Sequence, residues 1–314
     1  MSFHTLVIVN PASGNGATGR RWPELRAALD KQLDRWDNQF TTGPGDGTRL
    51  ARQGVADGYE MIVAVGGDGT MNEVVTGLFP EGDATPTALS RPDIVLSPVR
   101  QGTGGDFARF LGLPGEIPAC VAHLGGSNTR PCDLGVVELE GHDGKRIWRG
   151  FLNIASFGLS GLVVEKVNHS SKILGGKASF AWGLAKAMVG YRPQAVRITV
   201  DGARFVEEPI TTCAVANGQY FGGGMRFAPE ASIDDGQFDV VAQLKTGAKE
   251  ILAVRDVYSG RMSEWASVRR VRGAEVLAES TKAGQEVLLD IDGEGLGRLP
   301  ARFRIIPSAV RLKI

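Results

Sequence analysis

The chain has 314 residues, enough for one large or two medium domains with their own cores. Hydrophobic residues make up 42% and charged residues 22%, as in soluble globular proteins, and the 35 Lys+Arg balance the 35 Asp+Glu. This balance argues against a nucleic-acid partner. No apolar run approaches the ~18 residues of a membrane-spanning helix, and the three scattered cysteines predict neither disulfides nor structural zinc. The first residues predict no signal peptide, so we expect a cytoplasmic protein.

The first third of the chain alternates between apolar, strand-like runs and helical patterns. Alternating strands and helices predict a mostly parallel sheet covered by helices, that is, a three-layer α/β domain. Ligands of such sheets bind at the carboxyl ends of the strands, where the glycine-rich turns fall. The expected strands are 6–9, 39–42, 61–65 and 93–97, and the expected helices are 22–33 and 50–56.

The glycines at 14–19 fit the dinucleotide-binding spacing G-x-G-x-x-G. A site of that kind also needs an acidic residue about 20 positions further on. The corresponding stretch, 39–42, holds Gln, Phe, Thr and Thr. We therefore do not expect a Rossmann-type site, although these glycines can still cradle a phosphate.

The most informative stretch runs from Gly66 to Asn72. It follows the apolar run that ends at Val65, and a helical pattern follows at once. A glycine turn at a helix N-terminus presents unpaired backbone N–H groups to one point and lets a phosphate approach closely. Asp68 can hold a cation there, and Thr70 can donate a hydrogen bond to a phosphate. The stretch predicts a phosphate site; the alternative is a glycine-rich connection without a ligand.

From about residue 130 the pattern changes to short strand-like runs. Asp201-Gly202 and Asp292-Gly293 are typical of hairpin turns. Many short strands with such turns predict a β-sandwich-like second domain, which we expect to form a cleft with the first. The expected strands are 134–139, 147–154, 195–200, 204–206, 210–216, 238–244, 286–291 and 302–306, and the expected helices are 178–189 and 248–258.

Five motifs occur in a fixed order along the chain. They are Asn10-Pro11-Ala12-Ser13-Gly14, Thr41-Thr42-Gly43-Pro44-Gly45-Asp46, Gly66-Gly67-Asp68-Gly69-Thr70-Met71-Asn72-Glu73-Val74, Gly102-Thr103-Gly104-Gly105-Asp106-Phe107-Ala108-Arg109 and Asp292-Gly293-Glu294. Together they resemble the motifs of the diacylglycerol kinase catalytic family, in particular its bacterial lipid kinases, a family that also includes sphingosine kinases. Because the motifs span residues 10–294, the resemblance covers essentially the whole chain.

The resemblance implies an ATP-binding α/β domain at 1–129, to which a C-terminal strand at 308–314 returns, and a β-sandwich lipid-substrate domain at 130–307. It implies ATP and Mg²⁺ as cofactors and transfer of the γ-phosphate to a hydroxyl of a diacylglycerol-like lipid between the domains. The acceptor lies in a membrane, so we expect peripheral association with the membrane surface. A homodimer is left open.

The family's site residues carry over position by position. Glu294 is the expected general base, and Asp68 is a second catalytic residue that organises magnesium. Asp68, Asp106 and Asp133 are candidates for the catalytic Mg²⁺, of which one or two are expected to bind. The residues expected to bind ATP are Asn10, Thr41, Gly66, Gly67, Asp68, Gly69, Thr70, Met71, Asn72, Gly102 and Thr103.

The loop that contains Asp235 resembles one that binds a second, structural Mg²⁺ in bacterial members. The Asp235 carboxylate would act there with the backbone carbonyls of Ser232 and Gln237. The alternative is a tight Asp-Asp-Gly turn without a metal.

Two positions depart from the family pattern. Arg100-Gln101 stand where proline and a small or apolar residue are usual, and Gly105 replaces an asparagine. These departures put the local loop geometry and the substrate preference in question. Two other functions are also left open: an NAD kinase-like enzyme, which shares the Gly-Gly-Asp-Gly-Thr motif, and a catalytically inactive regulator that binds a nucleotide or lipid.

Overall fold

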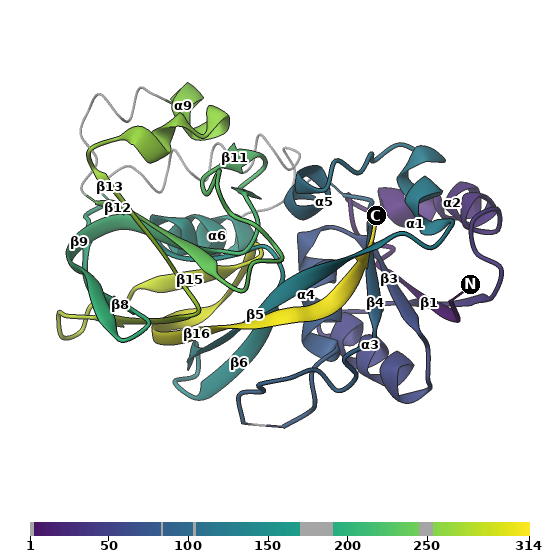
Figure 1. Ribbon diagram of the computed structural model, residues 1–314, viewed down its shortest axis with the longest axis horizontal. Helices are drawn as coiled ribbons and strands as arrows, with labels where there is room; N and C mark the ends of the chain where they lie inside the picture. The colour runs from purple at the N-terminus through teal and green to yellow at the C-terminus, as the bar shows by residue number, and fades with distance from the viewer. Residues whose placement is uncertain (1–2, 83, 103–104, 170–190, 245–253) are drawn as a thin grey trace.

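The computed structural model describes residues 3–82, 84–102, 105–169, 191–244 and 254–314. Figure 1 shows an α/β half that contains the N-terminus beside a β-rich half, with strands β5 and β16 running between them. Within the described ranges, fourteen strands form one continuous ladder with the main path β13-β12-β9-β7-β15-β16-β4-β3-β1-β2. The two halves therefore share one network of backbone hydrogen bonds.

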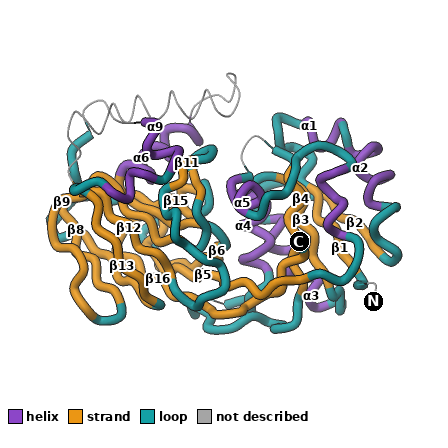
Figure 2. The backbone as a smooth tube through the Cα atoms, turned by 45° about the horizontal axis from the view of Figure 1, so that its top comes forward, coloured by secondary structure: helices purple, strands orange, loops and turns teal. Residues whose placement is uncertain are grey.

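The α/β half contains a parallel sheet in the order β4-β3-β1-β2. Its strands are β1 (Thr5–Val9), β2 (Trp36–Phe40), β3 (Met61–Gly66) and β4 (Val95–Arg100). Helices cover both faces (Figure 2), namely α1 (Ala17–Arg20), α2 (Trp22–Leu29), α3 (Asp46–Ala56), α4 (Asp68–Gly77), α5 (Asp106–Phe110) and the 3₁₀ helix η1 (Ala119–Leu124). Side chains of β1 alternate between the faces: Leu6 and Ile8 pack in the core with α3 and α4, and Val7 and Val9 in the core with α2. The predicted three-layer α/β arrangement is confirmed.

The β-rich half is antiparallel and packs around aromatic rings. Phe151 stacks on Phe238 and Phe157 on Phe303, with ring centroids 5.6 and 6.2 Å apart, as expected for a sandwich core. Its strands are β5 (Thr129–Gly141), β6 (Arg146–Phe151), β7 (Ile154–Gly158), β8 (Gln194–Val200), β9 (Ala203–Ala216), β10 (Tyr220–Phe221), β11 (Met225–Arg226), β12 (Phe238–Leu244), β13 (Val268–Gly273), β14 (Glu275–Ser280), β15 (Leu288–Ile291) and β16 (Glu294–Lys313). Its helices are α6 (Leu159–His169), α9 (Val254–Ser259) and the 3₁₀ helix η3 (Arg261–Glu264).

Several predicted strands merge or divide in the structure. The runs at 204–206 and 210–216 form the single strand β9, whereas 147–154 is divided between β6 and β7. β13 and β14 were not predicted, because arginine and glutamate interrupt their apolar pattern. The expected helix at 178–189 lies outside the described residues, as does the first part of 248–258. Among the residues that are described, no helix is long and apolar enough to cross a bilayer.

The end of the chain lies in the sheet of the α/β half. β16 pairs antiparallel with β5 over most of its length, and its last residues pair parallel with β4, with Leu312 opposite Leu96. Its register against β5 shifts between Ile306 and Val310, around Ser308, whose φ is +47°. The two expected strands at 302–306 and 308–314 are thus one strand with an irregularity. The domain boundaries at 129/130 and 307/308 stay a prediction.

Replacing Leu312 with alanine tests the contribution of this returning strand. Leu312 is fully buried in the core beneath α3 and α4, so we expect Leu312→Ala to lower the free energy of unfolding by about 2–5 kcal/mol. Ile314→Ala removes a more exposed side chain from the same end and should cost less than about 0.5 kcal/mol. Urea unfolding of both variants measures the difference; equal stabilities would show that the strand does not contribute to this core.

Candidate active site

Three glycine turns meet at the carboxyl ends of the parallel strands. Gly66 ends β3, and Gly102 lies just beyond β4. A Cβ atom added at Gly102 would lie 3.3 Å from the Gly67 Cα, and one added at Gly14 would lie 3.6 Å from the Gly102 Cα. The contact at Gly102 is tight, and Gly14 has a φ of +60°, which favours glycine. The turns therefore lie against one another through their backbones. Thr103, which follows, lies outside the described residues.

Asn10 and Thr70 connect two of these turns. Asn10 follows β1, and its Nδ2 donates a hydrogen bond of 3.0 Å to the Thr70 Oγ1 in the first turn of α4. Thr70 is buried, and a Cβ atom at Gly66 would overlap its side chain. The contact orients the Thr70 hydroxyl at the helix N-terminus, where backbone N–H groups also favour an anion. Met71, in contrast, packs its side chain into the core.

Glu73 fixes the loop that follows Thr41. Its Oε1 and Oε2 accept hydrogen bonds from the backbone N–H groups of Gly45 and Gly47, each at 2.8 Å. Thr41 itself is buried, and its backbone N–H donates to the Val9 carbonyl. The sequence carries no local signal for this role of Glu73, because its partners lie 26 and 28 positions away and only the fold brings them together.

Asp68 and Asp106 lie next to each other at the starts of α4 and α5. The Asp68 Oδ2 accepts hydrogen bonds from the backbone N–H groups of Gly105 (2.7 Å) and Asp106 (3.3 Å). Burial and, after it, the negative charge of Asp106 raise the pKa of Asp68 to about 6. A cation would favour the charged form of such a pair. Two carboxylates together with phosphate oxygens are a typical Mg²⁺ environment, so these residues fit the ion that the family resemblance implies.

Asp106 also connects the α/β half to the β-rich half. Its carboxylate forms an ion pair with Arg109 and accepts a hydrogen bond of 2.7 Å from the Gly223 N–H, between β10 and β11. A Cβ atom at Gly224 would lie 2.8 Å from the Arg109 Nη1. The glycine-rich loop at 222–224 therefore approaches α5 through its backbone.

Asp133 shares no hydrogen-bond partner with Asp68 or Asp106 among the described residues. Its carboxylate accepts hydrogen bonds from the backbone N–H groups of Gly236 (2.7 Å) and Ser308 (2.6 Å), and not from groups near Asp68 or Asp106. In the part of the chain that the structure describes, no group of three or more His, Cys, Asp or Glu residues is placed to hold a metal ion. The structure thus brings together two of the three acids predicted for the catalytic Mg²⁺.

A second connection between the halves is built around Asp292. Its Oδ1 accepts hydrogen bonds from the N–H groups of Asn153 (3.1 Å) and Ile154 (3.0 Å). Its Oδ2 accepts from the Leu152 N–H (3.0 Å) and from the Asn72 Nδ2 on α4 (3.3 Å). Asp292 is buried, and its φ of +51° and that of Gly293, +93°, agree with the predicted hairpin turn. This carboxylate holds the β15–β16 turn against α4.

The turn places Glu294 against the glycine motif. A Cβ atom at Gly69 would overlap the Glu294 Oε1, so the carboxylate lies directly over the first turn of α4. Glu294 comes from the β-rich half and Gly69 from the α/β half. The structure therefore brings the expected base and the expected phosphate-binding motif together from opposite sides.

Asp290 supports the same turn. Its Oδ1 accepts a hydrogen bond of 2.7 Å from the Gly293 N–H, and Ser156 lies 3.3 Å from its Oδ2. Burial raises its pKa to about 7. Asp290, Asp292 and Glu294 occupy alternate positions at the end of an apolar run. This alternation is the sequence signal for Asp290, which is absent from the predicted site residues.

The two departures from the family pattern are structurally linked. A Cβ atom at Gly105, whose φ is +80°, would lie 2.7 Å from the Cγ of Arg100. The Arg100 side chain thus fills the space that the side chain of a larger residue at position 105 would need. Gln101 is buried, and its Nε2 donates to the Gly115 carbonyl at 3.1 Å. Both replacements serve the packing of this loop.

Comparisons with known proteins agree with this architecture. Residues 4–137 match the diacylglycerol kinase catalytic domain, and residues 153–314 match the YegS C-terminal NAD kinase beta sandwich-like domain. The chain is 29% identical to a diacylglycerol kinase of Bacillus subtilis (strain 168), covering 95% of this chain and 91% of that one. It is 30% identical to a protein of Pseudomonas aeruginosa (strain PAO1) named probable lipid kinase YegS-like, covering 93% and 89%. A solved diacylglycerol kinase structure from Bacillus anthracis (strain Sterne) has the same fold, with a TM-score of 0.71 at 24% identity, covering 100% and 97%.

The raised pKa of Asp290 predicts a pH-dependent effect of Asp290→Asn. From the ordinary value of 3.8 up to about 7, the folded protein holds a proton that the unfolded chain releases. Stability therefore falls as the pH rises through this window. Asparagine keeps the acceptor for Gly293 and cannot ionise, so D290N should be more stable than wild type by about 1–3 kcal/mol near pH 8, and this gain should vanish below about pH 4.

Urea unfolding at both pH values measures this gain. The control is Asp143→Asn on the exposed β5–β6 turn, where a hydrogen bond from the Lys145 N–H lowers the pKa of the aspartate. D143N should show no gain at high pH. A D290N gain that is the same at both pH values would contradict the ionisation argument.

Proposed function

The chain belongs to the family of bacterial diacylglycerol kinases and YegS-like lipid kinases, and we propose that it transfers the γ-phosphate of ATP to a hydroxyl of a diacylglycerol-like lipid. The observation that carries the proposal is the position of Glu294 over Gly69. A carboxylate from one half faces a phosphate-binding turn of the other. Phosphoryl transfer to an alcohol needs such a proton acceptor beside a positioned phosphate chain.

Glu294 acts in this proposal as the general base. It accepts the proton of the acceptor hydroxyl while the hydroxyl oxygen forms a bond to the γ-phosphorus. The bond from the γ-phosphorus to the oxygen that bridges the β- and γ-phosphates breaks, and ADP leaves. The product is the phosphate monoester of the lipid. Asp292 holds the turn that positions Glu294 and takes no part in the proton transfer.

The α/β half binds ATP in this proposal. The backbone N–H groups at the start of α4, from Gly67 to Thr70, and at Gly102 face the phosphates. The Thr70 hydroxyl, oriented by Asn10, donates to one of them. Asp68 and Asp106 would hold Mg²⁺, which, when bound, neutralises charge on the phosphate oxygens. Asp68, with its pKa of about 6, is largely ionised at neutral pH and suits a cation-binding role. The acceptor lipid places the reaction at a membrane surface.

The experiment that tests this function is a transfer assay with γ-labelled ATP. Mixed micelles of diacylglycerol, a total lipid extract and NAD serve as separate acceptors. We expect label in a lipid product and none in NADP. Transfer to NAD alone would support an NAD kinase-like enzyme, and binding of ATP·Mg²⁺ without transfer to any acceptor would support an inactive regulator.

The role of Glu294 predicts a specific kinetic change in Glu294→Gln. The amide keeps the shape of the side chain but cannot accept the proton, so kcat should fall about 10²- to 10⁴-fold. The dissociation constant for ATP should stay close to that of wild type. The matched control is Glu286→Gln, an exposed acid just before β15 that pairs with Arg298, and it should keep wild-type kcat. Loss of ATP affinity together with kcat in E294Q would show that Glu294 is structural.

A further inference from the structure

We propose that Arg272 takes the place of a divalent cation at the loop 232–237, so that the loop keeps its conformation without a structural metal ion. This loop precedes β12 and contains Ser232, Asp235 and Gln237, for which the family resemblance implies a second Mg²⁺. The proposal concerns the stability of the β-rich half and does not depend on phosphoryl transfer at the active site.

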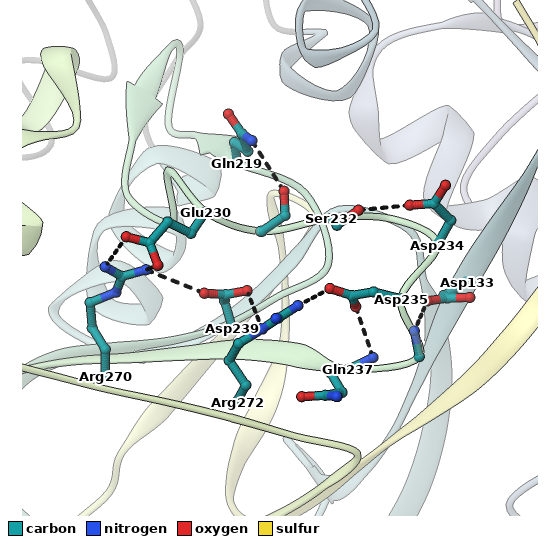
Figure 3. A network of polar contacts seen from close by, with 12 residues as sticks. Asp133, Gln219, Glu230, Ser232, Asp234, Asp235, Gln237, Asp239, Arg270 and Arg272 are labelled. Carbon is teal, nitrogen blue, oxygen red and sulfur yellow. Dashed lines mark hydrogen bonds and ion pairs between the residues drawn. The ribbon is translucent and has the colours of Figure 1, made fainter.

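Arg272 lies between two carboxylates. It stands opposite Asp239 in the antiparallel ladder of β12 and β13. Its Nη2 forms an ion pair with the Asp235 Oδ2, and its Nε lies 3.5 Å from the Asp239 Oδ2. Figure 3 shows the guanidinium reaching from β13 to both acids. One positive side chain thus links the loop to the strand that follows it.

Asp239 explains why a positive charge is needed at this place. It is only 3% exposed, and burial raises its pKa. A buried carboxylate without a partner is strongly destabilising. Arg270, two positions before Arg272 and therefore on the same face of β13, supplies a second charge: its Nη2 lies 3.4 Å from the Asp239 Oδ1. The guanidinium groups stay charged at any physiological pH.

The Asp235 carboxylate does not fit a divalent ion as the structure holds it. One oxygen contacts the Arg272 guanidinium, and the other accepts a hydrogen bond of 3.1 Å from the Gln237 N–H. Mg²⁺ requires near-octahedral oxygen ligands at ~2.0–2.1 Å. Here the Arg272 guanidinium contacts both Asp235 and Asp239 and thus occupies the place between the two carboxylates where a cation would bind.

The neighbouring carboxylates, Asp234 and Asp133, also have nitrogen donors as partners. Asp234 contacts Arg130 through both oxygens, at 3.0 Å each from the Arg130 Nη2. Asp133 binds the backbone N–H groups of Gly236 and Ser308. Each carboxylate around the loop therefore already has nitrogen donors as partners, which is the pattern of a loop held by arginines and backbone amides.

The position of the loop gives this arrangement a structural role. Asp133 is on β5 and Ser308 on β16, the two strands that run between the halves. The Asp133 carboxylate accepts hydrogen bonds from Gly236 in the loop and from Ser308 on β16, and so connects the loop to both strands. By fixing Asp235 and Asp239 relative to each other, Arg272 stabilises the loop at this junction.

Thermal unfolding without nucleotide tests the proposal. The melting temperatures of wild type and of Asp235→Asn are measured in EDTA and again in excess Mg²⁺ or Ca²⁺. The measured quantity is the metal-dependent shift of wild type minus that of D235N. We expect this difference to be zero, because Asp235 holds no ion. A larger shift in wild type than in D235N would overturn the proposal.

A second pair of variants tests the arginine directly. Arg272→Met should lower the melting temperature by about 1–3 °C, because the Arg272 side chain is 45% exposed and Asp239 keeps Arg270 as a partner. Arg269→Met, on the opposite face of the same strand and exposed, should leave it nearly unchanged. Equal melting temperatures of R272M and R269M would overturn the proposal. If R272M does not fold, the wild-type and D235N comparison still decides the question.

Discussion

The geometry of the active site depends on the hydrogen bonds of one buried carboxylate. Asp292 accepts three backbone N–H groups from residues 152–154 and the side-chain amide of Asn72. These bonds fix a turn whose positive φ angles already limit its shapes, and they join it to the helix that follows the glycine motif. Opening the halves at this point would separate Asp292 from the Asn72 amide, which among these four donors is the one from the α/β half, at a cost of about 1–3 kcal/mol. Glu294 therefore faces the α/β half from a turn whose position the Asp292 hydrogen bonds fix.

The same region concentrates negative charge. Asp68 has its pKa raised to about 6 and Asp290 to about 7, in both cases first by burial. Such acids reduce the stability of the folded chain at neutral pH, a cost often found where a site is arranged for function. The acids differ in their partners, and the partners separate their roles. Asp290 binds the Gly293 amide within the turn, and Asp292 binds the amides of residues 152–154. Asp68 binds amides at the start of α5 and lies beside Asp106 at two helix starts, where a cation and phosphates are favoured together.

Much of the fold and of the candidate site could be predicted from the sequence, and the limits have physical causes. The glycine motif, the parallel sheet and the Asp292-Gly293 turn depend on local patterns, namely apolar runs, glycine positions and turn residues. The contacts of Glu73 with Gly45, of Asp106 with Gly223 and of Arg272 with Asp235 depend on pairing between distant segments, which no local pattern encodes. β13 escaped prediction for the same reason: its arginines interrupt the apolar alternation and find their acids only in the folded ladder.

The central claim is that Glu294 acts from its place over Gly69, and a double-mutant cycle on kcat tests it most directly. Gly69→Ala adds a Cβ atom where the Glu294 Oε1 lies, whereas a Cβ atom at Gly67 meets nothing within 4 Å, which makes Gly67→Ala the steric control. The account predicts that G69A lowers kcat in the wild-type background but changes little in E294Q, because the displaced group is already inactive. If G69A lowers kcat by the same factor in both backgrounds, the contact between Gly69 and Glu294 is not the basis of catalysis.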